Sequence, residues 1–266
     1  MARPHSVRHQ RGFTFIALMC FFLLYLPMAT MVVFAFNAGS TVGQLDGFSL
    51  RWFRTALAND QIIEALLRSL TIAPIAAFFA TVAATMAALA TTRTAPYRGM
   101  ALKVAFINQP LMVPEIVTAV ALLVVFSRVK VWTGYTGLGY IIAAHTAFCI
   151  PFAFLPIRAR LETMDLSLET AAADLYARPW SVFRRITLPL LWPGILAGFM
   201  LAFVVSLDDV VITEFIKSAG QETLPTYMLG QLRRNVTPEM NAISTLFLAV
   251  SVIVVSLFFL LSRKKT

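Results

Sequence analysis

Six long stretches of apolar residues limit what this chain can fold into. Each has at least 20 residues without Lys or Arg, and only the third holds a carboxylate. A helix needs about 20 apolar residues to cross the hydrocarbon core of a bilayer, where an unpaired backbone group finds no water. The stretches cover residues 13–36, 70–92, 104–126, 138–157, 188–207 and 240–262. The sequence therefore predicts an all-α polytopic membrane protein, with six transmembrane helices in a single transmembrane domain over residues 1–266.

Composition and charge exclude several other classes of protein. Hydrophobic residues make up 59% of the chain and charged residues 13%, unlike an ordinary globular domain. The net charge of +9 comes from Lys and Arg at the ends of the apolar stretches, so no nucleic-acid partner is expected. Cys20 and Cys149 both lie inside apolar stretches, and no metal, disulfide or cofactor is predicted. The first stretch exceeds the roughly 7–15 apolar residues of a signal peptide, so we expect it to remain as a span.

The basic residues predict the orientation in the membrane. They form groups of three, three, five and three on one side of the six-span arrangement, the second group including Arg93. These are 14 of the 22 Lys and Arg residues, and the positive-inside rule assigns that side to the cytoplasm. Residues 1–12, 158–188 and 263–266 are therefore predicted to be cytoplasmic. On the other side, residues 48–57 have the apolar spacing of a short helix on the outer membrane surface.

The loop of residues 158–188 is the longest polar insert between two apolar stretches. Arg178 precedes a proline and is held out of the helical region, while Pro179 suits the first turn of a helix. The insert is therefore predicted to form a short helix, a turn and a second helix that begins at Pro179. One face of the first helix carries four apolar residues at helical spacing, Leu168, Ala171, Ala172 and Leu175. This face suits a docking site for a soluble partner, and the alternative is a solvated connector.

Three carboxylates lie inside or at the ends of the spans. A charge in a span is costly and usually faces a cavity or a partner. At about 1.5 Å per residue from Leu188, Asp208 and Asp209 fall at the outer end of the fifth span. Glu115 is expected on the same outer side. Together, the three carboxylates are predicted to line the path of a cationic small-molecule substrate.

Each polar residue in a span also has a structural alternative. The two aspartates could cap a helix or bind Arg233 and Arg234, and the glutamate could satisfy backbone groups freed by Pro110 and Pro114. His145 in the fourth span could relay protons. An interhelical hydrogen bond is the favoured interpretation of that histidine.

The sequence holds no Gly-x-x-x-x-Gly-Lys-Ser/Thr motif and no Gly-Lys pair, so this chain does not bind nucleotide phosphates itself. No catalytic residue is predicted, and any ATP hydrolysis is expected in a separate subunit. The insert nevertheless carries Ala171-Ala172, Asp174-Leu175, Ala177 and Ile186-Thr-Leu-Pro189. In these positions it resembles the Glu-Ala-Ala loop of the inner-membrane permease subunits of ABC importers. The resemblance implies that the ATPase-coupling residues are Glu169, Thr170, Ala171, Ala172, Asp174, Leu175, Tyr176 and Ala177.

The insert departs from that family pattern at two positions. Thr170 stands where the motif has Glu, although Glu169 is adjacent, and Tyr176 stands where it has Gly. A positive φ costs a residue with a side chain roughly 1 kcal/mol or more. We therefore expect the turn to shift toward residues 177–179.

The wider resemblance covers nearly the whole chain. Five segments carry it: Pro110-Leu-Met-Val-Pro-Glu115, His145-Thr-Ala-Phe-Cys149, Ser206-Leu-Asp-Asp-Val-Val-Ile212, Leu224-Pro225, and Val236-Thr-Pro-Glu239 with Asn241-Ala242. They look like the second membrane chain of the spermidine/putrescine permeases. This implies a six-helix fold of the type I ABC importer permeases with a cytoplasmic coupling helix, placed in a bacterial inner membrane.

The same resemblance implies what the chain does and with what it assembles. The expected function is inward transport of polyamines or a related cationic solute by alternating access. The expected partners are ABC ATPase subunits, a homologous permease subunit, a periplasmic or lipid-anchored substrate-binding protein, and membrane lipid. Two alternatives remain: a permease for another solute, such as an opine, an amino acid-like compound or a metal chelate, and a secondary carrier that uses the intramembrane acids. A secondary carrier has no need for an ATPase-docking helix.

Overall fold

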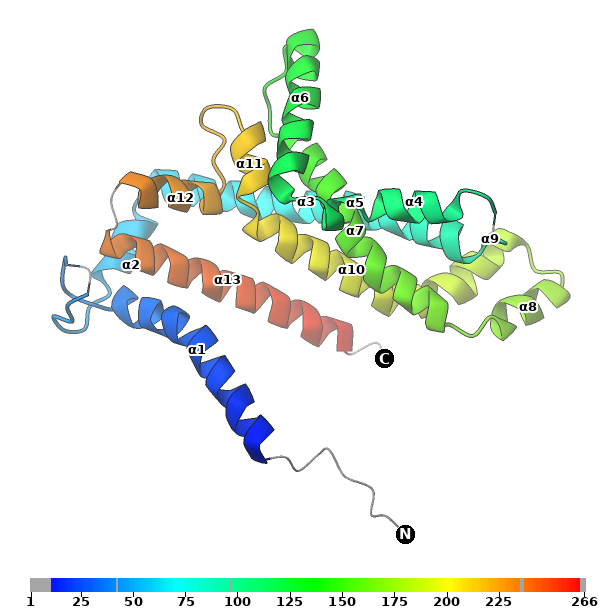
Figure 1. Cartoon of the computed structure of the whole chain (residues 1–266), viewed down its shortest axis with the longest axis horizontal. Coiled ribbons are helices and arrows are strands. Elements are labelled where there is room, and N and C mark those ends of the chain that lie inside the picture. Colours follow the sequence, from blue (N-terminus) through cyan, green and yellow to red (C-terminus); the bar gives the residue numbers. More distant parts are fainter. Residues whose placement is uncertain (1–10, 42, 96, 235–236, 264–266) are drawn as a thin grey trace. The chain divides into compact units, whose positions relative to one another are not determined.

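The structure is a computed structural model that describes residues 11–41, 43–95, 97–234 and 237–263. These residues form helices joined by short connections (Figure 1). The helices are α1 (Arg11–Ala35), α2 (Arg51–Leu57), α3 (Asp60–Thr92), α4 (Met100–Ile107), α5 (Gln109–Met112), α6 (Glu115–Thr133), α7 (Gly139–Thr163), α8 (Ser167–Asp174), α9 (Pro179–Val182), α10 (Leu188–Asp208), α11 (Val211–Ile216), α12 (Leu224–Arg234) and α13 (Pro238–Arg263). A π-helical turn, Phe183–Thr187, joins α9 to α10. The predicted all-α fold is confirmed.

Six helical segments among the described residues are long and apolar enough to cross a membrane, as predicted. They are Phe13–Ala35, Asp60–Thr92, Glu115–Thr133, Gly139–Thr163, Pro179–Asp208 and Pro238–Phe258. The second, fourth and fifth are longer than predicted because polar residues continue the helix beyond the apolar stretch. Residues 1–10 and 264–266 of the predicted cytoplasmic ends, and Val236 of one family segment, lie outside the described residues.

The chain divides into two compact units, which we describe separately. The first comprises residues 1–60 and 231–250. In it the loop after α1 is organised by Asn37, which is 2% exposed. The Asn37 amide donates to the Gln44 carbonyl (2.6 Å) and accepts from the Asp46 backbone N–H (2.8 Å). The short helix predicted within residues 48–57 is present as α2.

The second unit comprises residues 61–230 and 251–266 and contains every candidate site residue. Small residues on a membrane helix favour close packing with other helices. Six alanines of α3 are fully buried, Ala73, Ala76, Ala77, Ala80, Ala84 and Ala88.

Helices α7 and α10 of this unit pack side by side and antiparallel (Figure 1). Their contacts repeat about once per helical turn along both helices. The contacting pairs are Arg160 with Leu190, Pro156 with Gly194, Ala153 with Gly198, Cys149 with Ala202, and His145 with Ser206. On α10, four of these five residues are Gly, Ala or Ser, which allow two helix backbones to approach closely. We call this repeated contact the α7–α10 seam.

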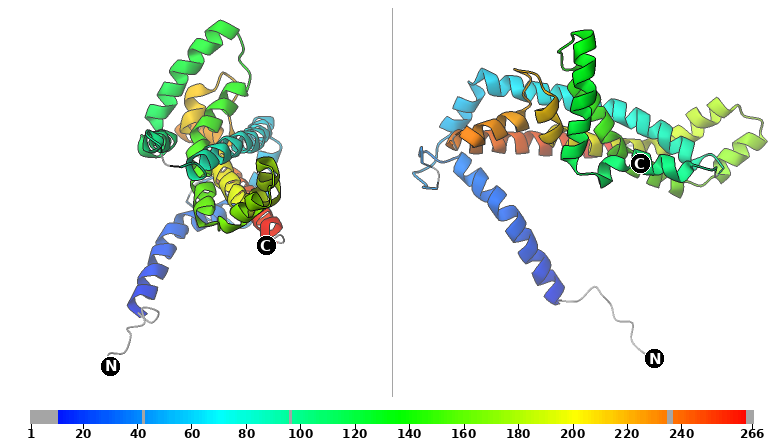
Figure 2. Two further views of the ribbon diagram at one scale, coloured as in Figure 1. Left: turned by 90° about the vertical axis from the view of Figure 1, so that its right-hand side faces the viewer. Right: turned by 45° about the horizontal axis from the view of Figure 1, so that its top comes forward.

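The predicted third span, residues 104–126, is interrupted where its prolines lie. The chain forms α4 and α5, becomes extended at Val113 (ψ 138°), and starts again as α6 at Glu115. Val113 is extended because it precedes Pro114, whose ring disfavours the helical region at that position. Figures 1 and 2 show α6 rising away from the layer that contains α7 and α10. Glu115 therefore lies at the start of a helix and not in the middle of a span.

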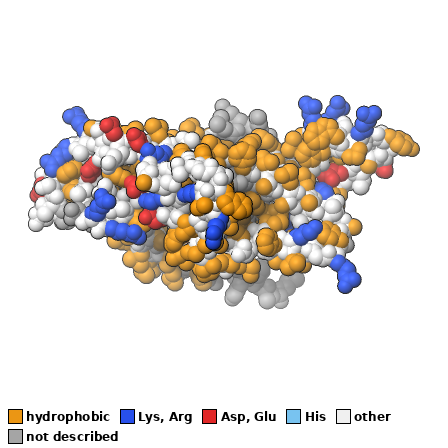
Figure 3. All heavy atoms as spheres, turned by 90° about the horizontal axis from the view of Figure 1, so that it is seen from above, with side chains coloured by type: hydrophobic (Ala, Val, Ile, Leu, Met, Phe, Trp, Pro, Cys, Tyr) orange, Lys and Arg blue, Asp and Glu red, His pale blue; other side chains and the backbone are white. Residues whose placement is uncertain are grey.

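Residues 158–163 of the insert continue α7, and the rest of the insert lies beyond the ends of α7 and α10, at one end of the second unit (Figure 1). At the end of the second unit that carries α8 and α9, Figure 3 shows Lys and Arg side chains next to a surface of apolar side chains. The predicted order of a short helix, a turn and a second helix from Pro179 is confirmed by α8 and α9.

The α7–α10 seam generates a prediction at Gly198. A Cβ atom at this position would lie 2.7 Å from the Ala153 carbonyl oxygen, so Gly198→Ala would force the helices apart. We expect a destabilisation of about 1–3 kcal/mol, the usual cost of overpacking. The measurement is the melting temperature of the protein purified in detergent.

Gly230→Ala in α12 is the matched control, because a Cβ there meets nothing within 4 Å. The control is expected to melt at the wild-type temperature or slightly above it, since Ala is the better helix former. Equal melting temperatures for the two variants would contradict the close approach of α7 and α10.

Candidate functional site

An acidic cavity of about 460 Å³ lies where α6 begins and where α10 ends. Three carboxylates line it, Glu115, Asp208 and Asp209, together with two aromatic rings, Phe148 and Phe152, and four valines. The structure thus brings together all three carboxylates that were predicted to line a substrate path. We call this site the acidic cavity.

Breaks in helices place these carboxylates in the cavity. Asp208 is the last residue of α10, and Asp209 has extended backbone angles (φ −64°, ψ 131°) before α11 begins. Glu115 reaches the same place because α6 starts directly after Pro114. Irregular backbone at membrane depth is tolerated where it lines a cavity or is buried in protein, and broken helices of this kind often hold substrate sites.

Asp209 is a buried acceptor of several hydrogen bonds and is 6% exposed. It accepts from the backbone N–H groups of Ile212 (3.2 Å) and Thr213 (2.9 Å), in the first turn of α11. The Thr213 hydroxyl donates to it as well (2.8 Å), and His145 Nε2 lies 3.2 Å from the same carboxylate oxygen. The proposed alternative of helix capping therefore holds for Asp209.

His145 connects three helices and is 1% exposed. Its Nδ1 lies 2.8 Å from the Ser206 hydroxyl on α10, and its Nε2 lies 2.8 Å from the Thr213 hydroxyl on α11. Both ring nitrogens of a buried histidine thus have partners, which a lone intramembrane His requires. The prediction that His145 makes an interhelical hydrogen bond is confirmed.

Asp208 and Glu115 differ from Asp209 in their surroundings. Asp208 is exposed to the cavity, and Glu115 is half-buried in its lining. Carboxylates that line one cavity repel each other, so a positive charge between them is favourable. The Phe148 and Phe152 rings, with centroids 5.4 Å apart, offer apolar contact and cation–π attraction beside the acids. The cavity is chemically suited to an alkylammonium ion.

The two adjacent aspartates are predicted to respond differently to neutralisation. Asp209→Asn weakens three hydrogen bonds to a charged, buried group, each contributing about 1.5–3 kcal/mol, so we expect a lower melting temperature and a lower yield of protein in detergent. Asp208→Asn changes an exposed side chain, and surface changes usually stay within about 0.5 kcal/mol. Equal losses of stability in the two variants would contradict this division.

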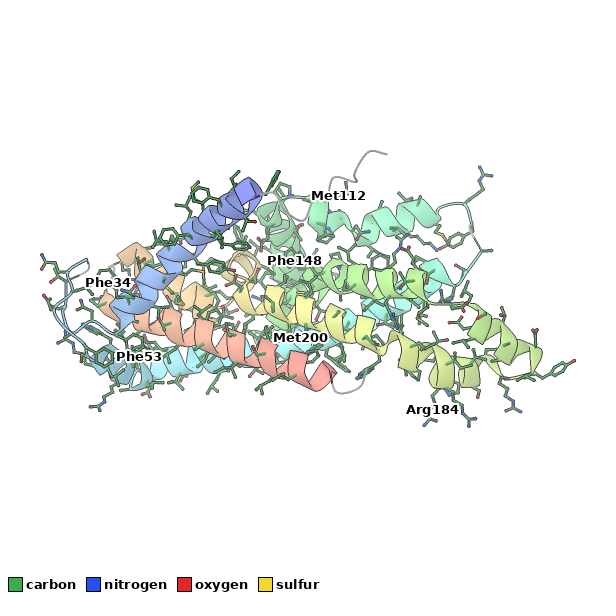
Figure 4. The ribbon with its side chains drawn as sticks, turned by 90° about the horizontal axis from the view of Figure 1, so that it is seen from below. Phe34, Phe53, Met112, Phe148, Arg184 and Met200 are labelled. Carbon is green, nitrogen blue, oxygen red and sulfur yellow. The ribbon has the colours of Figure 1, made fainter. Side chains whose placement is uncertain are left out.

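The insert forms a second candidate site, for docking a soluble partner. Helix α8 has no buried residue, and on its predicted apolar face Leu168 is 50% and Leu175 is 81% exposed. Asp165, just before α8, accepts from the Ser167 backbone N–H (2.9 Å), which holds the pKa of that carboxyl below its usual range. Figure 4 shows Arg184 at this end of the unit, well separated from Phe148 in the acidic cavity.

The turn after α8 corrects one prediction. The turn was expected to shift to residues 177–179, but Tyr176 itself takes the positive φ, 58°. Its N–H donates to the Ala173 carbonyl (2.9 Å) and the Ala177 N–H donates to the Ala172 carbonyl (3.1 Å), which is the Schellman arrangement of a helix end. These two bonds satisfy carbonyls that would otherwise lack partners, so they offset the strain at Tyr176. The turn therefore stays where the family motif has Gly.

Among the predicted coupling residues, Glu169 points toward the transmembrane helices and not toward solvent. Its side chain is 19% exposed and lies against Arg93, with Glu169 Oε2 3.2 Å from Arg93 Nε. Thr170, where the motif has Glu, bonds back to the Leu166 and Ser167 carbonyls of its own helix. Tyr176, in contrast, is 97% exposed.

Sequence reasoning missed several residues that the structure places at these sites. They are Phe148, Phe152, Ser206 and Thr213 around the acidic cavity, and Arg93 and Thr187 beside Glu169. A signal was available for two of them, because Ser206 and Thr213 are polar residues within four positions of Asp209. Arg93 was considered only as a marker of topology.

Comparison with known proteins gives a family match and two groups of relatives. The model of the family described as "Binding-protein-dependent transport system inner membrane component" matches residues 101–264. The chain is 38% identical over 252 residues to the putrescine transport system permease protein PotI of Escherichia coli (strain K12), covering 93% of this chain and 90% of that protein. It is 35% identical over 241 residues to the spermidine/putrescine transport system permease protein PotC of Haemophilus influenzae, covering 91% and 92%.

Solved structures resemble the fold. A chain of a bacterial ABC transporter involved in the import of the acidic polysaccharide alginate has a TM-score of 0.75 at 18% identity, covering 95% of this chain and 94% of that one. A chain of the inward-facing MetNI methionine ABC transporter has a TM-score of 0.65 at 18% identity, covering 77% and 95%. At these identities the likeness is one of fold alone.

Proposed function

The chain belongs to the family of binding-protein-dependent transport system inner membrane components, and from this premise we propose that it carries polyamines inward as the permease subunit of an ATP-driven importer. Family membership decides against the secondary carrier. Family membership does not by itself identify the solute, because relatives in one family can carry different compounds.

The acidic cavity is the observation that supports polyamines as the solute. Asp208 and Glu115 supply negative charge, and Phe148 and Phe152 supply apolar contact. A polyamine has ammonium groups separated by methylene chains, so it needs both kinds of contact in one place. The two relatives named for putrescine or spermidine support the same assignment. In this proposal Asp208 and Glu115 contact the solute, while Asp209 holds the cavity in shape.

The proposed partners follow from the exposed insert and the family. Helix α8 presents the apolar face that docks an ABC ATPase, while a homologous permease subunit and a periplasmic or lipid-anchored binding protein complete the importer. One solved relative is a bacterial alginate ABC transporter in complex with its alginate-bound periplasmic protein. The proposed location is the bacterial inner membrane, with both termini and the insert in the cytoplasm.

The proposed orientation predicts a labelling pattern. Cysteines introduced at Asp174 and at Gln221 are expected to lie on opposite sides of the membrane, because the basic residues mark the insert as cytoplasmic. In intact cells, a membrane-impermeant maleimide should therefore label the cysteine at 221 and label that at 174 only after the membrane is opened. Labelling of position 174 in intact cells would overturn the orientation and the docking proposal with it.

The solute is tested by uptake of radiolabelled putrescine and spermidine in cells without other polyamine importers. We expect the assembled importer to accumulate either compound. Asp208→Asn and Glu115→Gln should each reduce uptake about tenfold or more, because a hydrogen bond to a charged group contributes roughly 1.5–3 kcal/mol. Glu64→Gln, an exposed acid paired with Arg68 on α3, is the matched control and should leave uptake unchanged.

Two outcomes would count against this proposal. Uptake of an amino acid or a metal chelate with none of polyamines would replace the solute. Undiminished polyamine uptake in both cavity variants would remove the acidic cavity from the translocation path.

A further inference from the structure

An ion pair at the base of the insert connects α8 to the transmembrane helices. Arg93 directly follows the last residue of α3, and Glu169 lies in the first turn of α8. Arg93 donates through Nε and Nη2 to Glu169 Oε1, both at 3.3 Å, and its Nη1 donates to the Leu161 carbonyl near the end of α7 (3.2 Å). The Thr187 hydroxyl, just before α10, donates to the same Glu169 oxygen (3.1 Å). We call these four residues the Arg93–Glu169 clamp.

The Arg93–Glu169 ion pair is partly buried and joins elements far apart in the chain, so it can fix their relative position. Arg93 and Glu169 are 18% and 19% exposed and stand 76 positions apart in the chain. An arginine that uses three nitrogens on two partners is held in one orientation, because its donors have a rigid planar arrangement. By comparison, the pair of Arg158 and Glu162 joins two residues one turn apart on α7 and is 35% and 51% exposed.

Besides the clamp, helix α8 contacts α9 and the π-helical turn Phe183–Thr187. None of its residues is buried, so packing in a core does not position it. The Thr170 hydroxyl donates to carbonyls at the start of its own helix. The neighbouring Glu169 carboxylate instead accepts hydrogen bonds from Arg93 and Thr187, which lie outside α8. Glu169 therefore links α8 to Thr187 just before α10 and, through Arg93, to the end of α3 and to Leu161 of α7.

We propose that the Arg93–Glu169 clamp is the contact through which movement of the docked α8 is passed to the transmembrane helices, with Arg93 and Glu169 as positioning residues for coupling. This rests on the proposed function, in which α8 docks an ATPase. It assigns Glu169 a role behind the docking face and Arg93 a role besides topology. Neither residue contacts solute or nucleotide in this proposal.

The first test measures ATP hydrolysed per solute imported by the reconstituted importer. Arg93→Ala and Glu169→Gln leave the exposed face of α8 intact, so the ATPase should still co-purify. We expect the ratio of ATP hydrolysed to solute imported to rise about fivefold or more, the lower range of coupling between sites. The exchange Arg93→Glu with Glu169→Arg should restore much of the wild-type ratio.

Arg158→Ala and Glu162→Gln are the matched controls, since they break an ion pair of the same chemistry at the same end of α7. Both are expected to keep the wild-type ratio. An unchanged ratio in Arg93→Ala and Glu169→Gln would overturn the proposal. So would a loss of assembled complex in these variants with a normal ratio in what remains, because the clamp would then serve stability alone.

A second measurement does not depend on the solute. Spin labels at Thr94 and Ser167, in a chain whose two cysteines are replaced by alanine, report the distance between the end of α3 and the start of α8. With the clamp intact, we expect this distance to stay constant between nucleotide-free and ATP-vanadate states. In Arg93→Ala the distribution should broaden on adding nucleotide. A distance that changes equally in both proteins would overturn the clamp, whereas failure of polyamine uptake with a constant distance would count only against the proposed solute.

Discussion

The α7–α10 seam is the constraint on which the second unit depends. Five contacts about one turn apart hold the two helices in antiparallel register, from Arg160 with Leu190 at one end to His145 with Ser206 at the other. Gly194 and Gly198 permit this approach because a Cβ at either position would meet its neighbour within 3.0 Å. Without water in the bilayer core, close packing and interhelical hydrogen bonds take the place of the hydrophobic effect between helices. The register is therefore set by small residues and a few polar ones.

Both candidate sites lie at ends of this seam. Beyond Arg160 the chain enters the insert and returns through Thr187, which bonds to Glu169. Beyond Ser206 the chain ends α10 in the acidic cavity, where His145 also holds α11. Since the seam is closely packed along both helices, we expect a shift of α10 at the insert to move its other end as well. Under the proposed function, this packing is a route from docking to the cavity.

Much of this arrangement could be predicted from the sequence. The number of spans, the short helix before Pro179 and a hydrogen-bonding role for His145 follow from residue types and their spacing, and the structure confirms them. The prolines that interrupt the third span were visible in the sequence. The spanning helix nevertheless starts only at Glu115 and continues to Thr133, beyond the predicted end at residue 126. The pairing of Glu169 with Arg93 could not be predicted from the sequence. A contact between residues 76 positions apart depends on tertiary packing, which periodicity and motifs do not encode.

The adjacent acids Asp208 and Asp209 show how one short segment supplies both structure and charge. Successive residues on a helix point about 100° apart, and here the helix also ends between them. Asp209 turns toward α7 and α11, where backbone N–H groups, Thr213 and His145 compensate its burial. In the proposed function, this buried carboxylate therefore shapes the cavity and does not contact the solute. Asp208 keeps its exposure to the cavity because Asp209 fixes the break that presents it, so the exposed acid depends on the buried one for its position.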